Sequence, residues 1–223
     1  MRALLLPIKD LRNSKQRLES VLSSEERFAL AQAMLVDAFR AASRARLPAK
    51  VFVVTSYEPA MEVARQNGWE VLREEQQTSE SASVDFASRV CEERGVTAVL
   101  RFPLDLPLAR GDDIDDLLAT ACGPRAVVLV PSREGTGTNA ILRTPPTLFP
   151  SHFGLDSFAK HREEALRVGA QVLIRRNARL ELDVDDESDL RTLLRLNLSG
   201  TSTGQWLEQG GVASRLRSRS ASV

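Results

Sequence analysis

Residues 96–108 read VTAVLRFPLDLPL, a strand-like run that leads directly into a carboxylate between two prolines. The segment Val96–Phe102 is largely apolar without alternation, which is typical of a strand covered on both faces. Asp105 follows where that strand ends, between Pro103 and Pro107. Ligands of open α/β sheets bind at the carboxyl ends of the strands, so this stretch predicts an α/β fold and a functional position within it.

Similar strands alternate with helical segments along the rest of the chain. Apolar runs predict strands over residues 3–8, 51–54, 69–72, 96–102, 126–130, 138–143, 171–174 and 180–183. Helical spacing and capping signals predict helices over residues 24–45, 58–67, 80–94, 111–122, 157–168 and 187–196. This alternation predicts a mostly parallel sheet with helices on both faces.

Length and composition predict one globular domain and a tail. Hydrophobic residues make up 43% and charged residues 27% of the 223 residues, a balance that excludes disordered, collagen-like and disulfide-stapled chains. From Ser199 on, the composition shifts to Gly, Ser and Thr, and the chain ends among alternating Ser and Arg residues. We therefore expect a domain over residues 1–198 and a mobile or loosely docked Gly/Ser/Arg-rich tail over residues 199–223.

Charge and cysteine content indicate the cellular setting. Lys plus Arg and Asp plus Glu each number 30, so the formal net charge is 0, which argues against nucleic-acid and anionic-membrane partners. The two cysteines, Cys91 and Cys122, form no CxxC pair, which favours buried thiols in a reducing compartment. The apolar run after Arg2 is too short for a signal peptide, and we expect a cytoplasmic protein.

A basic cluster follows the first predicted strand. It consists of Lys9, Arg12, Lys15 and Arg17. Cations at a strand end could clamp a polyphosphate, although a solvated basic turn would carry the same residues. The segment contains no GxxxxGK[ST] pattern and is therefore not a Walker A loop.

Carboxylates follow two other predicted strands. Asp105 is placed to bind Mg²⁺, which takes few carboxylates and many phosphate oxygens. Asp183 and Asp185 alternate in the segment LDVDD at residues 182–186, so in extended backbone they face the same side. The alternative is a structural role for each, as a turn residue at 105 and as an acidic cap of the helix from residue 187.

A glycine–hydroxyl loop, GTGTN, spans residues 135–139. It matches GxGxxA only superficially, because the residues from Thr138 on have the pattern of a strand, whereas a dinucleotide fingerprint must open a helix. The loop could still offer N–H and O–H groups to phosphate oxygens, or be an ordinary turn. Gly154 and Ser157 precede the next helix and could bind an anion at its N-terminus. His161 lies on that helix, and without further ligands nearby zinc is not expected.

A nucleotidyltransferase needs cations for a triphosphate, separated carboxylates and an anion-binding loop, and this chain has candidates for all three. The reaction of such an enzyme requires no covalent nucleophile. At this level the chain resembles the 2-phospholactate guanylyltransferases, which include phosphoenolpyruvate and 3-phosphoglycerate variants and act in the synthesis of the deazaflavin coenzyme F-420. The resemblance extends over nearly all of residues 1–196. Its specific part is GTGTNA at residues 135–140 followed by FGxxSFxxH at residues 153–161; the DLPL segment at residues 105–108 is shared with other nucleotidyltransferases of the fold.

The resemblance implies a Rossmann-like GT-A nucleotidyltransferase fold and a role for each site residue. Lys15 and Asp105 would be catalytic. The other roles that it implies are GTP-phosphate binding by Lys9, Lys15 and Arg17; Mg²⁺ binding by Asp105, Asp183 and Asp185; and phospho-acid binding by Thr138, Asn139, Gly154 and Ser157.

The resemblance also implies partners and leaves some choices open. The expected partners are GTP, a phosphorylated three-carbon acid and a downstream transferase that carries the deazaflavin acceptor; a homodimer is a further expectation. Which acid is used, 2-phospholactate, phosphoenolpyruvate or 3-phosphoglycerate, stays open. The family usually has a Gly-Leu-Asn-like segment near the nucleotide base where this chain reads ESASVD at residues 80–85, so strict preference for GTP also stays open.

Two other functions fit parts of the pattern. Molybdenum-cofactor and sugar-phosphate nucleotidyltransferases share the fold but usually carry a glycine-rich LxGGxGxR loop after the first strand, and residues 4–18 contain no glycine. A non-catalytic nucleotide-binding protein would be expected to have lost a metal carboxylate or the phosphate loop. Asp105, Asp183 and the GTGTN loop are all present.

Overall fold

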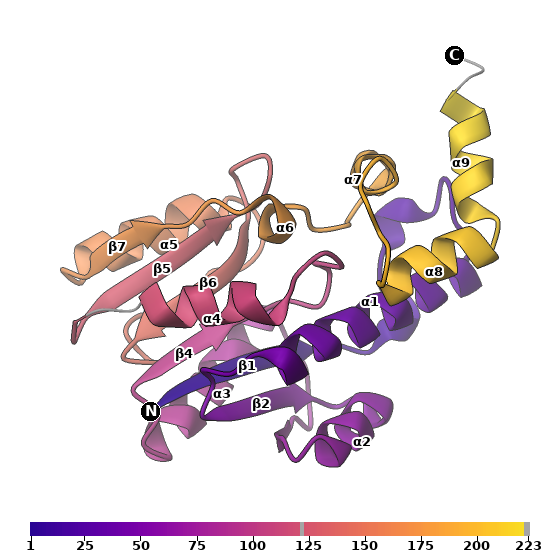
Figure 1. Ribbon diagram of the computed structural model, residues 1–223. Coiled ribbons are helices and arrows are strands. Elements are labelled where there is room, and N and C mark those ends of the chain that lie inside the picture. Colours follow the sequence, from indigo (N-terminus) through magenta and orange to yellow (C-terminus); the bar gives the residue numbers. More distant parts are fainter. Residues whose placement is uncertain (121–122, 221–223) are drawn as a thin grey trace.

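The computed structural model describes residues 1–120 and 123–220, and its centre is one twisted sheet (Figure 1). The strand order is β3-β2-β1-β4-β6-β5-β7. Only β6 runs antiparallel to its neighbours, β4 and β5, so the predicted mostly parallel sheet is confirmed. The strands are β1 (Arg2–Ile8), β2 (Lys50–Thr55), β3 (Glu70–Arg73), β4 (Ala98–Arg101), β5 (Ala126–Pro131), β6 (Thr138–Thr144) and β7 (Gln171–Ile174).

Helices cover both faces of the sheet, as the alternation predicted. Apolar side chains of α1, α2 and α4 pack on one face, and those of α3 and α5 pack on the other. The α-helices are α1 (Ser24–Arg44), α2 (Glu58–Gln66), α3 (Glu80–Glu93), α4 (Gly111–Thr120), α5 (Ser157–Arg167), α6 (Ala178–Glu181), α7 (Glu187–Leu193), α8 (Ser202–Gln209) and α9 (Val212–Ser220). Two short 3₁₀ helices, η1 (Leu11–Asn13) and η2 (Gln16–Leu18), lie between β1 and α1.

The central strand β1 shows why its sequence is a continuous apolar run. Leu4 and Leu6 pack in the cluster that includes α1 and α4, whereas Leu5 packs in the cluster that includes α3. All three side chains are fully buried. A strand covered on both faces has no solvent side, so no polar residue alternates with the apolar ones.

The segments that carry the candidate site residues meet at one edge of the sheet. The parallel strands β1 and β4 are neighbours, so the segments after Ile8 and after Arg101 leave the sheet at the same end. Strand β6 runs in the opposite direction beside β4, which places its first residue, Thr138, at that end as well. The antiparallel direction of β6 therefore brings the start of one strand to the carboxyl ends of others.

Residues 180–183 do not form the expected strand. Ala178–Glu181 is instead a single helical turn, α6, followed by irregular chain. The side chain of Asn177 caps this turn by accepting a hydrogen bond from the Arg179 N–H, and the Arg179 guanidinium pairs with the buried carboxylate of Asp113 on α4. A side-chain cap and an ion pair thus override the strand pattern, and Asp183 lies in a loop.

The predicted mobile tail is also corrected, because residues 202–220 form two helices of which α8 packs along α1 (Figure 1). The buried carboxylate of Asp37 on α1 accepts hydrogen bonds from the N–H groups of Ser202 (2.6 Å) and Thr203 (2.8 Å). These N–H groups at the start of α8 have no partner within the helix, so the carboxylate anchors it. The domain therefore extends beyond the expected boundary at residue 198.

Leu207→Ala should lower the free energy of unfolding by about 3 kcal/mol, since it removes a fully buried side chain from the cluster that joins α8 to α1. Urea denaturation measures this change. The matched control is Leu166→Ala on α5, whose side chain is 59% exposed. A loss below about 0.5 kcal/mol at Leu207 would mean that the tail is loosely docked after all.

The remaining expectations concern cysteine and membranes. Cys91 is buried on α3, and burial raises the pKa of its thiol to about 12, which fits an unreactive core residue. Cys122 lies outside the described residues. None of the helices within residues 1–120 and 123–220 has the length and apolar character needed to span a bilayer.

Candidate active site

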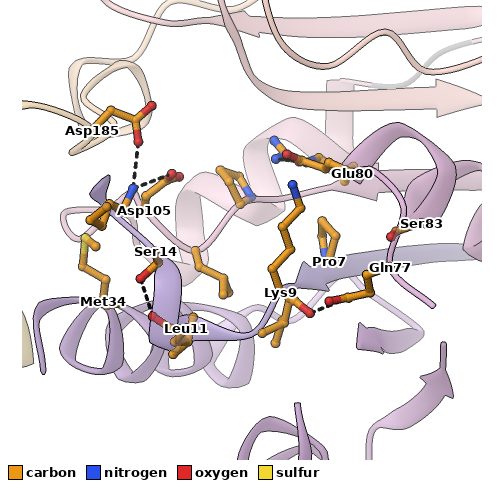
Figure 2. Close-up of a pocket in the computed structure, with 16 residues that line it drawn as sticks. Pro7, Lys9, Leu11, Ser14, Met34, Gln77, Glu80, Ser83, Asp105 and Asp185 are labelled. Carbon is orange, nitrogen blue, oxygen red and sulfur yellow. Dashed lines mark hydrogen bonds and ion pairs between the residues drawn. The ribbon is translucent and has the colours of Figure 1, made fainter. Parts of the chain in front are cut away.

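Two pockets share one wall at the strand-end edge of the sheet. The first pocket (Figure 2) is formed by the segment after β1, by α1 and by the start of α3. The second is formed by the GTGTN loop, the start of α5 and the segment 183–189. Both pockets are lined by Glu80, Arg101, Pro103, Asp105 and Asp185.

Lys15 ties two carboxylates of the shared wall together. Its Nζ donates to Asp105 Oδ2 at 3.0 Å and to Asp185 Oδ1 at 2.8 Å, and dashed lines at the labelled Asp105 and Asp185 mark these contacts in Figure 2. The Lys15 side chain is only 10% exposed. Its backbone is left-handed (φ 55°), a conformation uncommon for a residue with a Cβ. Such strain is concentrated at functional sites, where the surrounding structure holds the residue in place.

The charges around Lys15 shift its pKa and that of Asp105 in opposite directions. Burial by itself lowers the pKa of the Lys15 amine, but the negative charges of Asp105 and Asp185 outweigh it and raise the pKa. Burial by itself raises the pKa of Asp105, but the Lys15 charge outweighs it and lowers the pKa. At neutral pH the site therefore holds a fixed ammonium group between carboxylates.

The predicted basic cluster is divided by the fold. Lys9 lines the first pocket together with Lys15, and in Figure 2 its side chain extends towards Glu80. Arg17, expected at the same phosphates, lines the second pocket instead. Arg12 lines neither of the two; its side chain is 76% exposed and pairs with Asp10. The solvated-turn interpretation thus holds for Arg12, and the first pocket contains only Lys9 and Lys15 of this cluster.

Asp183 is a half-buried carboxylate of the second pocket. Its pKa is raised to about 6, mainly by burial and further by the negative charges of Asp105 and, to a smaller extent, Asp185. Asn139 partly opposes it, because its Nδ2 donates to Asp183 Oδ1 at 3.0 Å. The three predicted metal carboxylates are therefore close enough to repel one another.

Asn139 has a structural connection beyond its contact with Asp183. The same Nδ2 also lies 3.0 Å from the carbonyl oxygen of Leu180 and 3.1 Å from that of Glu181. The amide nitrogen is thus directed at the segment that leads to Asp183, although Asn139 was expected to bind the phospho-acid. Its position in the second pocket lets it hold the carboxylate segment in place.

The glycine–hydroxyl loop and the start of α5 join at Thr138. The Thr138 N–H donates to Ser157 Oγ (2.9 Å), and the Thr138 hydroxyl lies 2.9 Å from Nδ1 of His161. The start of α5 is less free than predicted, since the Ser157 N–H donates to the Gly154 carbonyl oxygen at 3.2 Å. Thr138, Gly154 and Ser157 all line the second pocket, and Thr138 and Ser157 contribute hydroxyl groups to its lining.

Arg101 is the main site residue that sequence reasoning missed. Its side chain is 8% exposed, forms an ion pair with Glu80 and donates through Nη1 to the Asn139 carbonyl oxygen at 2.7 Å. Its guanidinium lies 4.3 Å from the ring centroid of Phe153, within the range of a cation–π contact. The signal was available, because Arg101 is the one charged residue in the run 96–102 and lies two positions before the PLDLP segment.

The carboxylates fit a cation that brings most of its ligands from elsewhere. Within the described ranges, no three or more His, Cys, Asp or Glu side chains group closely enough to form a metal site by themselves. Mg²⁺ needs no such cage, since it binds through one or two carboxylates together with water and substrate phosphates. Besides burial, the negative charges of Asp105 and Asp185 raise the pKa of Asp183, and a cation would neutralise this excess negative charge.

The family model described as "Guanylyl transferase CofC like" matches residues 1–222. The chain belongs to this family. The resemblance inferred from the GTGTNA and FGxxSFxxH segments is confirmed, and so is the guanylyltransferase class. The match also includes the C-terminal helices, in agreement with their packing on α1.

Curated relatives of this guanylyl transferase are similar over most of its length. A phosphoenolpyruvate guanylyltransferase of Rubrobacter xylanophilus is 36% identical over 200 residues, 88% of this chain and 93% of the relative. One of Conexibacter woesei is 34% identical over 193 residues, 86% of each chain. A 2-phospho-L-lactate guanylyltransferase of Methanothermobacter thermautotrophicus is 30% identical over 205 residues, 92% of this chain and 89% of the relative.

Solved structures share the fold of this guanylyl transferase at low sequence identity. A putative nucleotide-diphospho-sugar transferase from Desulfovibrio desulfuricans G20 superposes with a TM-score of 0.76 at 18% identity, covering 96% of this chain and 97% of the other. A nucleotidyl transferase from Methanothermobacter has a TM-score of 0.58 at 14% identity, covering 94% and 99%. The expected nucleotidyltransferase fold is thereby confirmed.

Proposed function

We propose that this guanylyl transferase moves GMP from GTP to the phosphate of a small phosphorylated three-carbon acid and releases pyrophosphate. Phosphoenolpyruvate is the first acceptor to test, because it is named in the relatives at 36% and 34% identity. 2-Phospho-L-lactate is named in the relative at 30% identity, and 3-phosphoglycerate follows from the sequence resemblance.

The observation that carries this proposal is Lys15 in the first pocket, bound to Asp105 and Asp185, which line both pockets. The first pocket offers the amines of Lys9 and Lys15 to a triphosphate. The second offers the hydroxyls of Thr138 and Ser157 to a smaller anion. A reaction at the shared wall would join an anion from each side, which is what a transfer of GMP to a phosphorylated acid requires.

The reaction depends more on neutralising the charges of the two anionic substrates than on proton transfer. A phosphate oxygen of the acceptor forms a bond to the α-phosphorus of GTP, while the bond to the bridging oxygen breaks and pyrophosphate leaves with its electron pair. The attacking oxygen is already ionised at neutral pH, so no strong base is needed. The ammonium of Lys15 offsets the repulsion between the two anions, and positioning in adjacent pockets contributes up to about 7 kcal/mol.

Mg²⁺ is the proposed cofactor, held by one or two of the carboxylates Asp105, Asp183 and Asp185 together with substrate phosphates. When bound, it neutralises negative charge on the phosphates and aligns them. Lys15 holds Asp105 and Asp185, and Asn139 holds Asp183, so each carboxylate is oriented by a neighbouring side chain. This support restricts their movement before substrates arrive.

Mg²⁺ affinity measured with bound GTP should fall by about tenfold per pH unit below pH 6. The pKa of Asp183 is raised to about 6, so below that pH the cation must displace a proton from this carboxyl, whereas above it the carboxylate is already free. Calorimetry at pH 5 and pH 8, in buffers of different ionisation enthalpy, measures both affinity and proton release. Asp183→Asn is the control for the titration of GTP itself, and an identical pH response in both proteins would contradict the role of Asp183.

Polar side chains at and before the start of α3 line one side of the first pocket. Glu80 pairs with Arg101, and the Ser83 hydroxyl donates to Glu74 Oε2 at 2.8 Å. Gln77 lines the same pocket and donates from Nε2 to the Ile8 carbonyl oxygen at 2.9 Å. We assign the nucleotide base to this side of the pocket, where these polar groups replace the Gly-Leu-Asn-like segment of the family.

The remaining partners belong to the same proposal. The product would pass to a transferase that carries the deazaflavin acceptor, in the synthesis of coenzyme F-420. A homodimer and a cytoplasmic location stay predictions. Size-exclusion chromatography with light scattering tests the first, and fractionation of the source cells tests the second.

The decisive experiment measures pyrophosphate release from GTP and Mg²⁺ with each of the three acids, using ATP as the control nucleotide. Release with one acid and GTP would establish the reaction and name the acceptor. The assay includes the downstream transferase and its deazaflavin acceptor, which remove the product. If no pyrophosphate is released although GTP binds, the result would favour another acceptor, such as a sugar phosphate or molybdenum-cofactor precursor. It would also be consistent with a non-catalytic nucleotide-binding protein.

A further inference from the structure

His161 is a fully buried histidine directly behind the second pocket. It lies on α5, with its ring centroid 4.9 Å from that of Phe153 and 6.3 Å from that of Phe149. Both of its ring nitrogens have polar partners: Nε2 lies 2.8 Å from the backbone nitrogen of His152, and Nδ1 lies 2.9 Å from the hydroxyl oxygen of Thr138. The reaction described above does not use this side chain.

The two contacts determine where the His161 proton is. A backbone N–H can only donate, so the N–H of His152 requires a lone pair on Nε2 of His161. A neutral imidazole with a lone pair on Nε2 carries its proton on Nδ1. That proton points at Thr138, so Nδ1 donates to the hydroxyl oxygen.

This donation leaves the hydroxyl proton of Thr138 free for another acceptor. Ser157 is in the same position, because its Oγ accepts the hydrogen bond of the Thr138 N–H at 2.9 Å. Each hydroxyl oxygen thus already accepts a hydrogen bond from the protein. Both hydroxyls belong to the lining of the second pocket, where each can donate its own proton.

We propose that His161 is a positioning residue that orients the Thr138 hydroxyl as a hydrogen-bond donor to the anionic group of the phospho-acid. This inference rests on the proposed function for the identity of the anion. Donors oriented before the ligand arrives cost no reorganisation on binding, and an accepted hydrogen bond strengthens the one that the same hydroxyl donates. His161 would act on affinity for the acid through Thr138, without touching the acid itself.

The surroundings keep His161 in the neutral form that this role needs. The pKa of its imidazole is lowered to about 3, mainly by burial and to a smaller extent by the electrostatic effects of Arg143, His152 and Arg101. A second proton, on Nε2, would also be unfavourable, because it would point at the His152 N–H that now donates to this nitrogen. The orientation of the Thr138 hydroxyl therefore stays the same over the pH range in which the enzyme can be assayed.

The tautomer is measurable by nitrogen-15 NMR of the imidazole rings, since the chain has only two histidines. His152→Gln assigns the spectrum and is a matched control, because it keeps the backbone N–H that contacts His161. The expected result is a neutral His161 ring, protonated on Nδ1 and unchanged between pH 8 and pH 5. A proton on Nε2, or titration of this ring in that range, would overturn the proposal.

A kinetic double-mutant cycle tests the action through Thr138. His161→Phe should raise KM for the phospho-acid by about tenfold, equivalent to about 1.4 kcal/mol, and leave KM for GTP unchanged. In a Thr138→Val background, the same change should have no further effect on KM for the acid. His161→Asn, which can retain a side-chain N–H near Nδ1, should restore part of the affinity.

If His161→Phe raises KM for the acid equally in the wild-type and in the Thr138→Val background, His161 has a merely structural role. The same conclusion follows if His161→Phe raises KM for GTP as much as KM for the acid. If His161→Phe does not fold, His161→Leu replaces it in the cycle, and the tautomer measurement still applies. The two possible failures are distinguishable. A wild-type protein inactive with all three acids contradicts the proposed function, whereas an active wild type without coupling contradicts the role of His161 alone.

Discussion

Asp105→Asn is expected to reduce kcat by about 10³-fold or more while the protein remains folded. The amide keeps the shape of the side chain but removes the negative charge from the wall shared by the two pockets. A charge that stabilises phosphoryl transfer contributes several kcal/mol, and each 1.36 kcal/mol of barrier corresponds to about tenfold in rate. The hydrogen bond from the Val184 N–H to the Asp105 carbonyl oxygen is made by the backbone and is retained.

Steady-state pyrophosphate release and thermal denaturation together check this result. Asp112→Asn is the matched control, because Asp112 is an exposed carboxylate on α4 outside both pockets of the site, and its loss should leave kcat unchanged. Retained turnover in Asp105→Asn would remove Asp105 from the metal site. A fall in melting temperature that parallels the loss of activity would instead indicate a structural role for the carboxylate.

Lys15→Ala should raise KM for GTP by about 100-fold, the upper end of what a hydrogen bond to a charged group contributes. The substitution removes the ammonium that faces the triphosphate pocket and leaves Asp105 and Asp185 without their shared partner. Without that charge, the carboxylates repel one another and the incoming phosphates. Lys15→Met, which keeps most of the side-chain length without the charge, should have the same effect.

Arg12→Ala is the matched control for the lysine. Arg12 belongs to the same basic segment, but its side chain is 76% exposed and its ion pair with Asp10 is on the surface. Surface ion pairs of this kind contribute about 0–1 kcal/mol, so both KM for GTP and stability should remain near wild type. An unchanged response to GTP in the Lys15 variants would place Lys15 with Arg12 as a residue of a structural turn.

The comparison of these two cations shows how far the sequence could predict the site. Lys15 and Arg12 have the same charge, lie three positions apart and follow the same strand. Only the left-handed backbone at Lys15 and the path of the chain through η1 and η2 direct one side chain inward and leave the other in water. Local charge pattern does not encode that difference, because the carboxylates that bind Lys15 are 90 and 170 residues away.

The errors in the sequence interpretation have a related cause. The segment 180–183 has the apolar pattern of a strand, but Asn177 caps a helical turn there and Asp113 holds Arg179. The polar composition after Ser199 suggests a mobile tail, but Asp37 on a distant helix accepts the first N–H groups of α8. In both places a buried carboxylate from another element decides the local conformation.

The sequence by itself determined the alternation of strands and helices, the glycine–hydroxyl loop, the DLPL carboxylate and the family, because these depend on residues close together along the chain. Only the tertiary structure decided which cations reach the site, how Arg101 pairs with Glu80, and that His161 carries its proton on Nδ1. Those properties depend on distances between atoms of separate elements. Such distances are set when the sheet assembles and buried polar groups must find partners.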